Sequence, residues 1–299
     1  MFLTDRQLAR PALTRRSVRG IARGMLTDAV PQLRIYDSEP DPACRMAARE
    51  LLRPPFERPT ARGLEPFTRG WYEEIELKRY ARQGEWLPKL LEFRRHVGES
   101  LVMVGPGLGT DAIQYRRHET QVTICALPLD DTLAMRRNFE LRGLNLPIVE
   151  TPTAEALPFA RGAFDLAYLN TLNAHHANLA KVAEEMYRVL KPGGKLLALF
   201  PAWYDVSCWQ RWLLPLQRLY WQAPPAPTTG PKLTAHELRT AFSRFRDFRV
   251  NQRHLRRSEL PHVWRLLPTS LLERFLGRVL VLRAFKPLSA VREESTAAA

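Results

Sequence analysis

Strand-like and helical segments alternate along the middle of this 299-residue chain, and this alternation constrains the fold more than any other feature. Short apolar runs are separated by stretches with the three- to four-residue apolar spacing of helices. Strands are predicted at 101–104, 122–126, 148–149, 164–170 and 195–200, and helices over 71–93, from 110 onward, over 129–142 and over 177–190. Such alternation predicts a parallel sheet with right-handed crossovers and helices on both faces.

A glycine-rich turn follows the first predicted strand. Gly105, Gly107 and Gly109 stand at alternate positions, and a helix is predicted to start near Thr110 and Asp111. Glycine lets the backbone turn tightly and approach a ligand, and the free N–H groups at a helix start favour polar or anionic groups. Taken alone, the turn is equally consistent with any tight strand-to-helix connection. Thr110 replaces the third glycine of the dinucleotide pattern, which disfavours nicotinamide binding.

Three further segments complete a recognisable order. They are VTICALPLDD (Val122–Asp131), a segment with AEALPF followed by Phe164-Asp165 (Pro152–Asn170), and YRVLKPGGKLLALF (Tyr187–Phe200). With LVMVGPGLGTD (Leu101–Asp111), they resemble class I S-adenosylmethionine-dependent methyltransferases, particularly the small-molecule group that includes the ubiquinone and menaquinone enzymes. The resemblance implies a Rossmann-like α/β fold: a seven-stranded sheet with helices on both faces and an antiparallel last strand.

The resemblance also implies where S-adenosylmethionine would lie, over the carboxyl ends of the first strands. The three glycines would face its methionine and ribose portions, Ala154 and Glu155 its adenine, and Asn170 and Leu172 its sulfonium and the acceptor. The predicted cofactor-binding residues are Gly105, Gly107, Gly109, Asp111, Ala126, Thr153, Ala154, Glu155, Asn170 and Leu172. No metal site is expected.

Two of these positions depart from the family pattern. Family members usually end the second strand with an acidic residue that binds the ribose hydroxyls, and here Ala126 stands there. Thr153 stands where an aspartate often contacts the adenine amino group. A hydrogen bond to a charged acceptor contributes about 1.5–3 kcal/mol, so losing one weakens binding about ten- to hundredfold. We hypothesise that Asp130 or Asp131 reaches back to the ribose.

The sequence assigns no catalytic residue. His175 and His176 follow the fourth strand, where the family commonly has a histidine pair near the rim of the site, although a capping or structural pair fits as well. Tyr72, Glu73 and Tyr80 lie on a helix that in this family can fold over the cofactor, and core packing is the alternative for the tyrosines.

The expected organisation has three parts. Residues 1–70 form a partly disordered arm, 71–287 the methyltransferase domain with a Trp- and Pro-rich insertion at 201–231, and 288–299 a disordered tail. The indoles of the insertion suit an apolar, planar or lipidic acceptor, and ordinary helix packing explains them equally well. A capping box predicts a helix from Thr234, and strands are predicted at 245–250 and 279–285.

The net charge of +14 is concentrated on the flanks. Residues 100–200 balance at ten basic and ten acidic side chains, whereas 232–287 hold thirteen Lys or Arg against four acids. This basic region could contact anionic surfaces, with a solvated face as the default, and no aromatic platform for nucleic acid is recognisable. The three scattered cysteines and the lack of a long apolar run favour a cytoplasmic protein without a membrane span.

The expected function is therefore methyl transfer from S-adenosylmethionine to a small, apolar metabolite. The alternative is a relative that keeps the fold, has lost or altered cofactor binding, and serves as a ligand- or protein-binding module. A nucleic-acid-binding methyltransferase is a third class. Ala126 and Thr153 are the residues that separate the first two.

Overall fold

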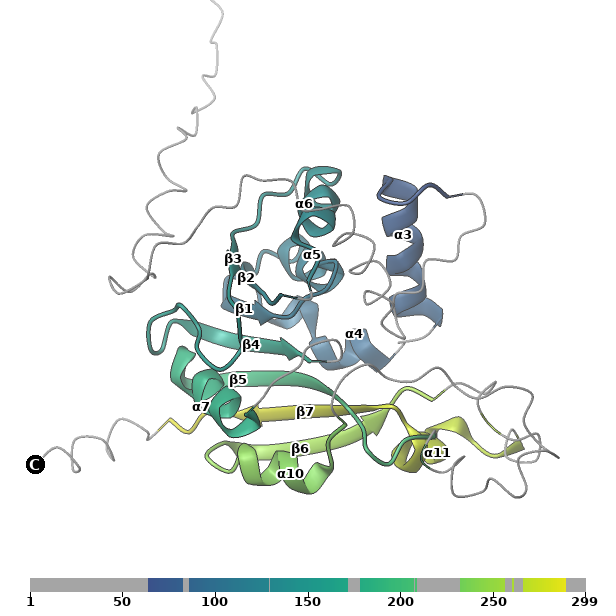
Figure 1. Ribbon diagram of the computed structural model, residues 1–299, viewed down its shortest axis with the longest axis vertical. Helices are drawn as coiled ribbons and strands as arrows, with labels where there is room; N and C mark the ends of the chain where they lie inside the picture. The colour runs from purple at the N-terminus through teal and green to yellow at the C-terminus, as the bar shows by residue number, and fades with distance from the viewer. Residues whose placement is uncertain are drawn as a thin grey trace, which may run out of the picture.

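Seven strands form one mixed sheet, and the glycine turn follows the end of one of its central strands (Figure 1). Their spatial order is β3-β2-β1-β4-β5-β7-β6. All neighbours are parallel except β7, which is antiparallel to both β5 and β6. The strands are β1 Ser100–Val104, β2 Gln121–Ala126, β3 Ile148–Glu150, β4 Phe164–Asn170, β5 Leu190–Pro201, β6 Arg246–Arg253 and β7 Val279–Phe285. The predicted seven-stranded α/β sheet with an antiparallel last strand is confirmed.

The computed structural model describes residues 64–82, 86–128, 130–171, 178–206, 208, 232–255, 260 and 266–288. Most of the predicted arm therefore lies outside the described residues, as do most of the 201–231 insertion and all but the first residue of the 288–299 tail. The predicted domain limits stay predictions.

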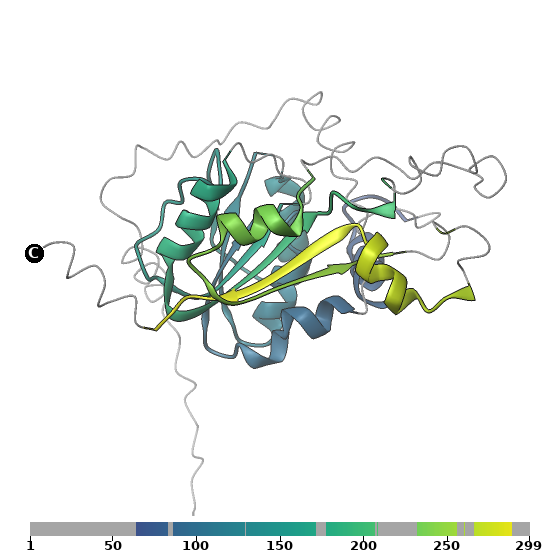
Figure 2. The same cartoon turned by 90° about the horizontal axis from the view of Figure 1, so that it is seen from below.

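Helices cover both faces of the sheet, as Figure 2 shows. On one face α7 and α10 pack over a core that includes Val102, Val104 and Ala167. On the other, α4, α5 and α6 pack over Leu101, Met103 and Leu166. Alternate residues of one strand thus enter opposite layers, and all of β1 is buried, which explains its continuous apolar run. The helices are α3 Arg69–Leu77, α4 Trp86–Leu91, α5 Thr110–Arg117, α6 Thr132–Glu140, α7 Leu179–Val189, α10 Ala235–Ala241 and α11 Thr269–Leu276.

Local side chains set where several helices begin. Asn178 caps α7 by accepting from the Ala180 and Lys181 amides, and the buried face of α7 repeats at Val182, Met186 and Val189. Thr234 and Glu237 form the predicted capping box at the start of α10. Each arrangement satisfies N–H groups that a helix start leaves unpaired.

The helical pattern of residues 71–93 divides into several pieces in the structure. After α3 come a π-helix, Lys78–Arg82, then α4 and a 3-10 turn, Phe93–Arg95. Pro88 is the third residue of α4, where its missing N–H costs little because the first turn leaves that group unpaired. The apolar spacing thus predicted helical structure correctly and missed its interruptions.

Candidate functional site

The glycine turn joins the carboxyl end of β1 to α5. Gly105, Gly107 and Gly109 all have left-handed backbone angles, with φ of +67°, +61° and +74°. A Cβ on Gly105 would lie 2.4 Å from the carbonyl oxygen of Asn170, the last residue of β4. A Cβ on Gly109 would lie 2.6 Å from the Phe139 ring. These positions therefore require glycine, because the ends of β1 and β4 and helix α6 approach the turn closely.

Asp130 connects the glycine turn to the end of β2. Its carboxylate accepts hydrogen bonds from the Gly107 amide at 2.9 Å and from the Leu127 amide at 2.8 Å. The side chain is partly exposed overall, yet burial around its carboxyl raises its pKa to about 7, against the lowering effect of the two amides. A carboxyl group that ionises around pH 7 thus lies beside the glycine turn, four residues after the position where the family pattern places an acidic side chain.

Ala126 and Asp131 have other positions. Ala126 is buried at the end of β2, in register with Glu150 at the end of β3. Asp131 is the N-cap of α6 and accepts from the Ala134 amide at 2.8 Å. Asp130 and Asp131 were both proposed to reach back to the ribose. Of the two, Asp130 is the one whose carboxylate reaches the glycine turn.

Asp111, in the first turn of α5, lies in a buried polar cluster. Arg79 of the π-helix donates to its two carboxylate oxygens, from Nε at 2.8 Å and from Nη2 at 2.5 Å, and both side chains are only 3% exposed. The Tyr80 and Tyr168 hydroxyls donate to the same carboxylate at 2.6 and 2.9 Å. Burial acts to raise the pKa of Asp111, but Arg79 and the two hydroxyls hold it below its usual value.

This cluster fixes the segment before β1 against the helix that starts at the glycine turn. Burial and the neighbouring Asp111 charge keep the pKa values of Tyr80 and Tyr168 well above their usual value, so both remain neutral donors. Asp111 was predicted as a cofactor contact, and this role stays a prediction. Arg79 and Tyr168 were not identified from the sequence, since neither belongs to a recognisable motif.

The residues predicted to lie near the adenine, 153–155, form a hydrogen-bonded turn after β3. The Glu155 amide donates to the Thr153 hydroxyl at 3.1 Å, and the Glu155 carboxylate accepts from the Asn178 amide at 2.9 Å. Ala154 between them is buried. Glu155 therefore links this turn to the start of α7, and its backbone is fixed without a ligand.

The remaining predicted residues are divided between the core and undescribed positions. Asn170 is 9% exposed at the end of β4. Tyr72 is buried, its hydroxyl donates to the Ala134 carbonyl at 2.6 Å, and burial raises its pKa, all of which a packing residue would show. Leu172, His175 and His176 lie outside the described residues, so these roles stay predictions.

Helix α3 lies beside the glycine turn. Its residues Trp71, Tyr72 and Ile75 pack with Leu108 of the turn and Ala134 of α6. Glu73 instead faces solvent and pairs with Arg69 at 2.8 Å. The segment before β1 thus contacts the loop predicted to bind the cofactor.

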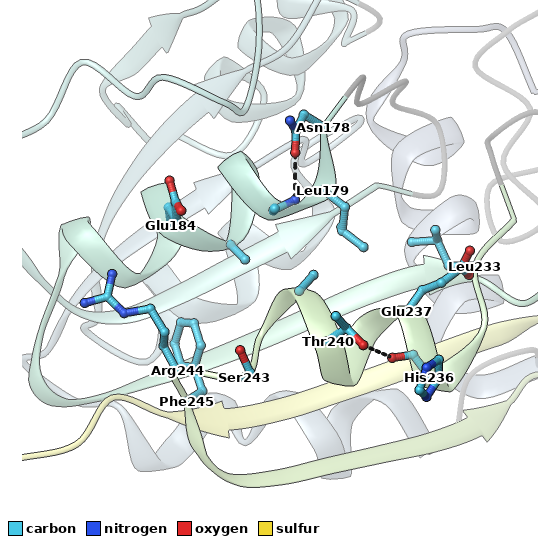
Figure 3. Close-up of a pocket in the computed structure, with 13 residues that line it drawn as sticks. Asn178, Leu179, Glu184, Leu233, His236, Glu237, Thr240, Ser243, Arg244 and Phe245 are labelled. Carbon is cyan, nitrogen blue, oxygen red and sulfur yellow. Dashed lines mark hydrogen bonds between the residues drawn. The ribbon is translucent and has the colours of Figure 1, made fainter.

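A separate groove of about 610 Å³ lies between α7 and α10 (Figure 3). Asn178 and Leu233 are at one end, and Arg244 and Phe245 are at the other. Small side chains on the facing helices, such as Ala183, leave this space open. None of the predicted cofactor residues lines it, so the groove is distinct from the glycine turn.

The Lys-Pro-Gly-Gly motif lies at the opposite, amino edge of the sheet. Lys191 Nζ is 2.7 Å from the Asp165 carboxylate, which also accepts from the Ser100 hydroxyl at 2.6 Å. These three residues belong to the starts of β5, β4 and β1. The most recognisable motif therefore joins strands, at a distance from the glycine turn.

The described residues hold neither a membrane-spanning helix nor a cluster of metal ligands. No helix there has both the length and the apolar character to cross a bilayer. No group of three or more His, Cys, Asp or Glu side chains in the described ranges is arranged to hold a metal ion.

The seven-stranded α/β sheet and the glycine turn have the Rossmann-like arrangement that the sequence resemblance predicted. Residues 102–198, from β1 through most of β5, match the family model described as a methyltransferase domain. This match agrees with the resemblance to class I S-adenosylmethionine-dependent methyltransferases and covers about a third of the chain.

Individual relatives match over parts of the chain. Demethylmenaquinone methyltransferase of Thermus thermophilus is 45% identical over 67 residues, which are 22% of this chain and 30% of that enzyme. An uncharacterized 37.1 kDa protein in transposon TN4556 of Streptomyces fradiae is 32% identical over 112 residues, 37% of this chain and 32% of that protein. The matches thus span about a third of these relatives. The YcgJ protein of Bacillus subtilis aligns with a TM-score of 0.48 and 15% identity, over 68% of this chain and 98% of its own.

Proposed function

We propose that this protein transfers a methyl group from S-adenosylmethionine to a small, apolar acceptor. The observation that carries the proposal is the Asp130 carboxylate beside the glycine turn, bonded to the Gly107 and Leu127 amides. It supplies an acidic group near the site whose usual carboxylate is replaced by Ala126. The family match over residues 102–198 supports the same activity.

The residues around the turn suit an adenosine-containing cofactor. Three glycines in left-handed conformations bring the turn close to the carboxyl edge, and the start of α5 adds a positive dipole end. Each Asp130 oxygen accepts one amide and keeps acceptor capacity for a ribose hydroxyl. Bound there, S-adenosylmethionine would supply the electrophilic methyl group. The task of the chain is to align the acceptor, with a base where the acceptor carries a proton.

The apolar character of the acceptor rests on residues after β5. Trp203 and Tyr204 follow that strand at the carboxyl edge and expose 53% and 57% of their surface. Aromatic side chains of this kind favour apolar or planar ligands. The rest of the Trp-rich segment lies outside the described residues.

Calorimetry with S-adenosylmethionine and S-adenosylhomocysteine tests the cofactor site. Asp130→Asn should weaken binding about ten- to hundredfold, because it removes a charged acceptor. Asp131→Asn is the matched control, since asparagine also caps helices and should preserve both the start of α6 and affinity. Equal binding by both variants and the wild type would remove Asp130 from the site. No binding by the wild type at millimolar cofactor would favour the module that has lost its cofactor.

Radiolabelled S-adenosylmethionine tests the acceptor class. The protein is incubated with cell extract separated into organic-soluble, water-soluble and nucleic-acid fractions. We expect label in the organic-soluble fraction, and Asp130→Asn should reduce it. Label confined to nucleic acid or to water-soluble metabolites would overturn the apolar acceptor while leaving methyl transfer intact.

A further inference from the structure

Helix α11 exposes apolar side chains that the fold does not use. Leu271 and Phe275, one turn apart, are 55% and 59% exposed, and Leu266 just before the helix is 88% exposed. The neighbouring part of the same apolar stripe supplies Leu272 and Leu276 to a small buried cluster. A surface helix normally buries its apolar stripe, whereas α11 buries only one half of it and leaves the other half exposed.

Two exposed aromatic residues continue this apolar surface. Gln252 Nε2 donates to the Tyr204 carbonyl at 2.7 Å and to the Gly277 carbonyl at 2.6 Å. This single amide group holds the segment containing Trp203 and Tyr204 beside the end of α11. We define the interfacial patch as the exposed apolar residues of these two segments: Trp203, Tyr204, Leu266, Leu267, Leu271 and Phe275.

Basic side chains accompany the interfacial patch. Arg274 is exposed on α11, and the charge of Glu273 is compensated by Arg253 at 3.4 Å. The positive charge at the patch is therefore that of Arg274, while Arg246 and Lys286 of the same basic region lie at the far end of β6 and β7. Apolar side chains that insert below the headgroups, combined with basic side chains that attract anionic lipid, are the features of an interfacial membrane site.

The interfacial patch lies at the same edge of the sheet as the glycine turn. Val279 begins β7 directly after α11 and is in register with Pro201, the last residue of β5. The carboxyl ends of β1, β4 and β5 therefore point toward the side of the molecule that carries α11 (Figure 1). An acceptor dissolved in a bilayer would enter at this edge.

We propose that the interfacial patch docks the protein on the surface of an anionic lipid bilayer, from which the methyl acceptor is taken. The docking stands on the patch and its charge, and the acceptor clause rests on the proposed function. A lipidic acceptor that is poorly soluble in water is the substrate class for which such docking is needed.

Vesicle co-sedimentation of the full chain tests the docking. The wild type should bind vesicles of phosphatidylcholine mixed with phosphatidylglycerol, bind phosphatidylcholine alone weakly, and lose binding as salt rises. The double variant Leu271→Ser/Phe275→Ser should bind the anionic vesicles about thirtyfold more weakly, because two half-exposed apolar side chains no longer insert. Arg274→Glu should weaken binding to anionic vesicles alone.

Leu133→Ser is the matched control, because Leu133 on α6 is 45% exposed and lies outside the interfacial patch. It should bind vesicles like the wild type. Equal binding by the double variant, or no binding of the wild type to anionic vesicles, would overturn the docking. A concentration-dependent dimer that the double variant abolishes, without vesicle binding, would overturn it in favour of a second copy of the chain.

Calorimetry with S-adenosylhomocysteine separates this proposal from the proposed function. The double variant should keep the wild-type affinity for that probe, since its substitutions are on α11. Vesicle binding without cofactor binding would overturn the methyltransferase proposal alone, and cofactor binding without vesicle binding would overturn the docking alone.

Discussion

Replacing Arg79 by methionine should strongly destabilise the protein, because it leaves a carboxylate buried without its cation. Asp111 would retain the Tyr80 and Tyr168 hydroxyls, at 2.6 and 2.9 Å, and lose both guanidinium hydrogen bonds. Removing one partner of a buried ion pair costs about 3–5 kcal/mol. Both side chains are 3% exposed, so solvent cannot restore this loss cheaply.

Urea unfolding followed by circular dichroism measures the effect. With a slope of about 3 kcal/mol per molar urea, the midpoint should fall by about 1–1.7 M. Arg79→Lys should fall between the variant and the wild type, because lysine keeps the charge and loses the two-pronged geometry. The double variant Arg79→Met/Asp111→Leu should recover a large part of the loss, since neither charge then stays buried alone.

The pH dependence gives an independent check on the same pair. The pKa of Asp111 is depressed in the folded protein, so its stabilisation is present above the unfolded-state pKa of about 4 and is lost as pH falls through the lower folded value. The Arg79→Met variant should lack this contribution. A loss below about 1 kcal/mol at neutral pH, or strictly additive effects in the double variant, would refute the reasoning.

Three further predictions concern the two edges of the sheet. Gly105→Ala should abolish S-adenosylhomocysteine binding in calorimetry by forcing strand ends apart, whereas Gly162→Ala, with a similar φ of +66° and no atom within 4 Å of the added Cβ, should bind normally. Affinity for S-adenosylhomocysteine should rise with pH through about 7 and then level off, as the Asp130 carboxyl ionises, and a pH-independent affinity would contradict this. Lys191→Met should cost at most about 1 kcal/mol in urea unfolding and leave cofactor affinity unchanged, because its ion pair with Asp165 is partly exposed and lies at the far edge.

Much of the fold followed from local patterns in the sequence. Apolar runs located the central strands because helices on both faces make those strands apolar throughout. The Thr234 capping box predicted α10 because capping depends on neighbouring residues alone. Helix α11 was not predicted, because its 8 residues are too few for the apolar spacing to identify a helix reliably, although that spacing is one-sided.

The candidate site was less predictable because its contacts join distant segments. The sequence offered both Asp130 and Asp131 as replacement carboxylates. Choosing between them required the structure, which shows that Asp131 caps α6 and that Asp130 contacts the glycine turn. The cluster around Asp111 joins residues 31 to 57 positions apart, so no sequence spacing reveals it. Hydrogen bonding between segments so distant is set by tertiary packing.

Lys191 belongs to the most recognisable motif of the chain, yet its ion pair with Asp165 concerns the fold and not the cofactor site. The ion pair joins the starts of two strands and lies at the edge away from the glycine turn, so it can support the fold whether or not the protein transfers methyl groups. Proteins that share this motif would therefore be expected to share the fold, which is a weaker statement than sharing the activity. We expect residues at the other edge, such as Asp130 beside the glycine turn, to distinguish the active enzymes among them.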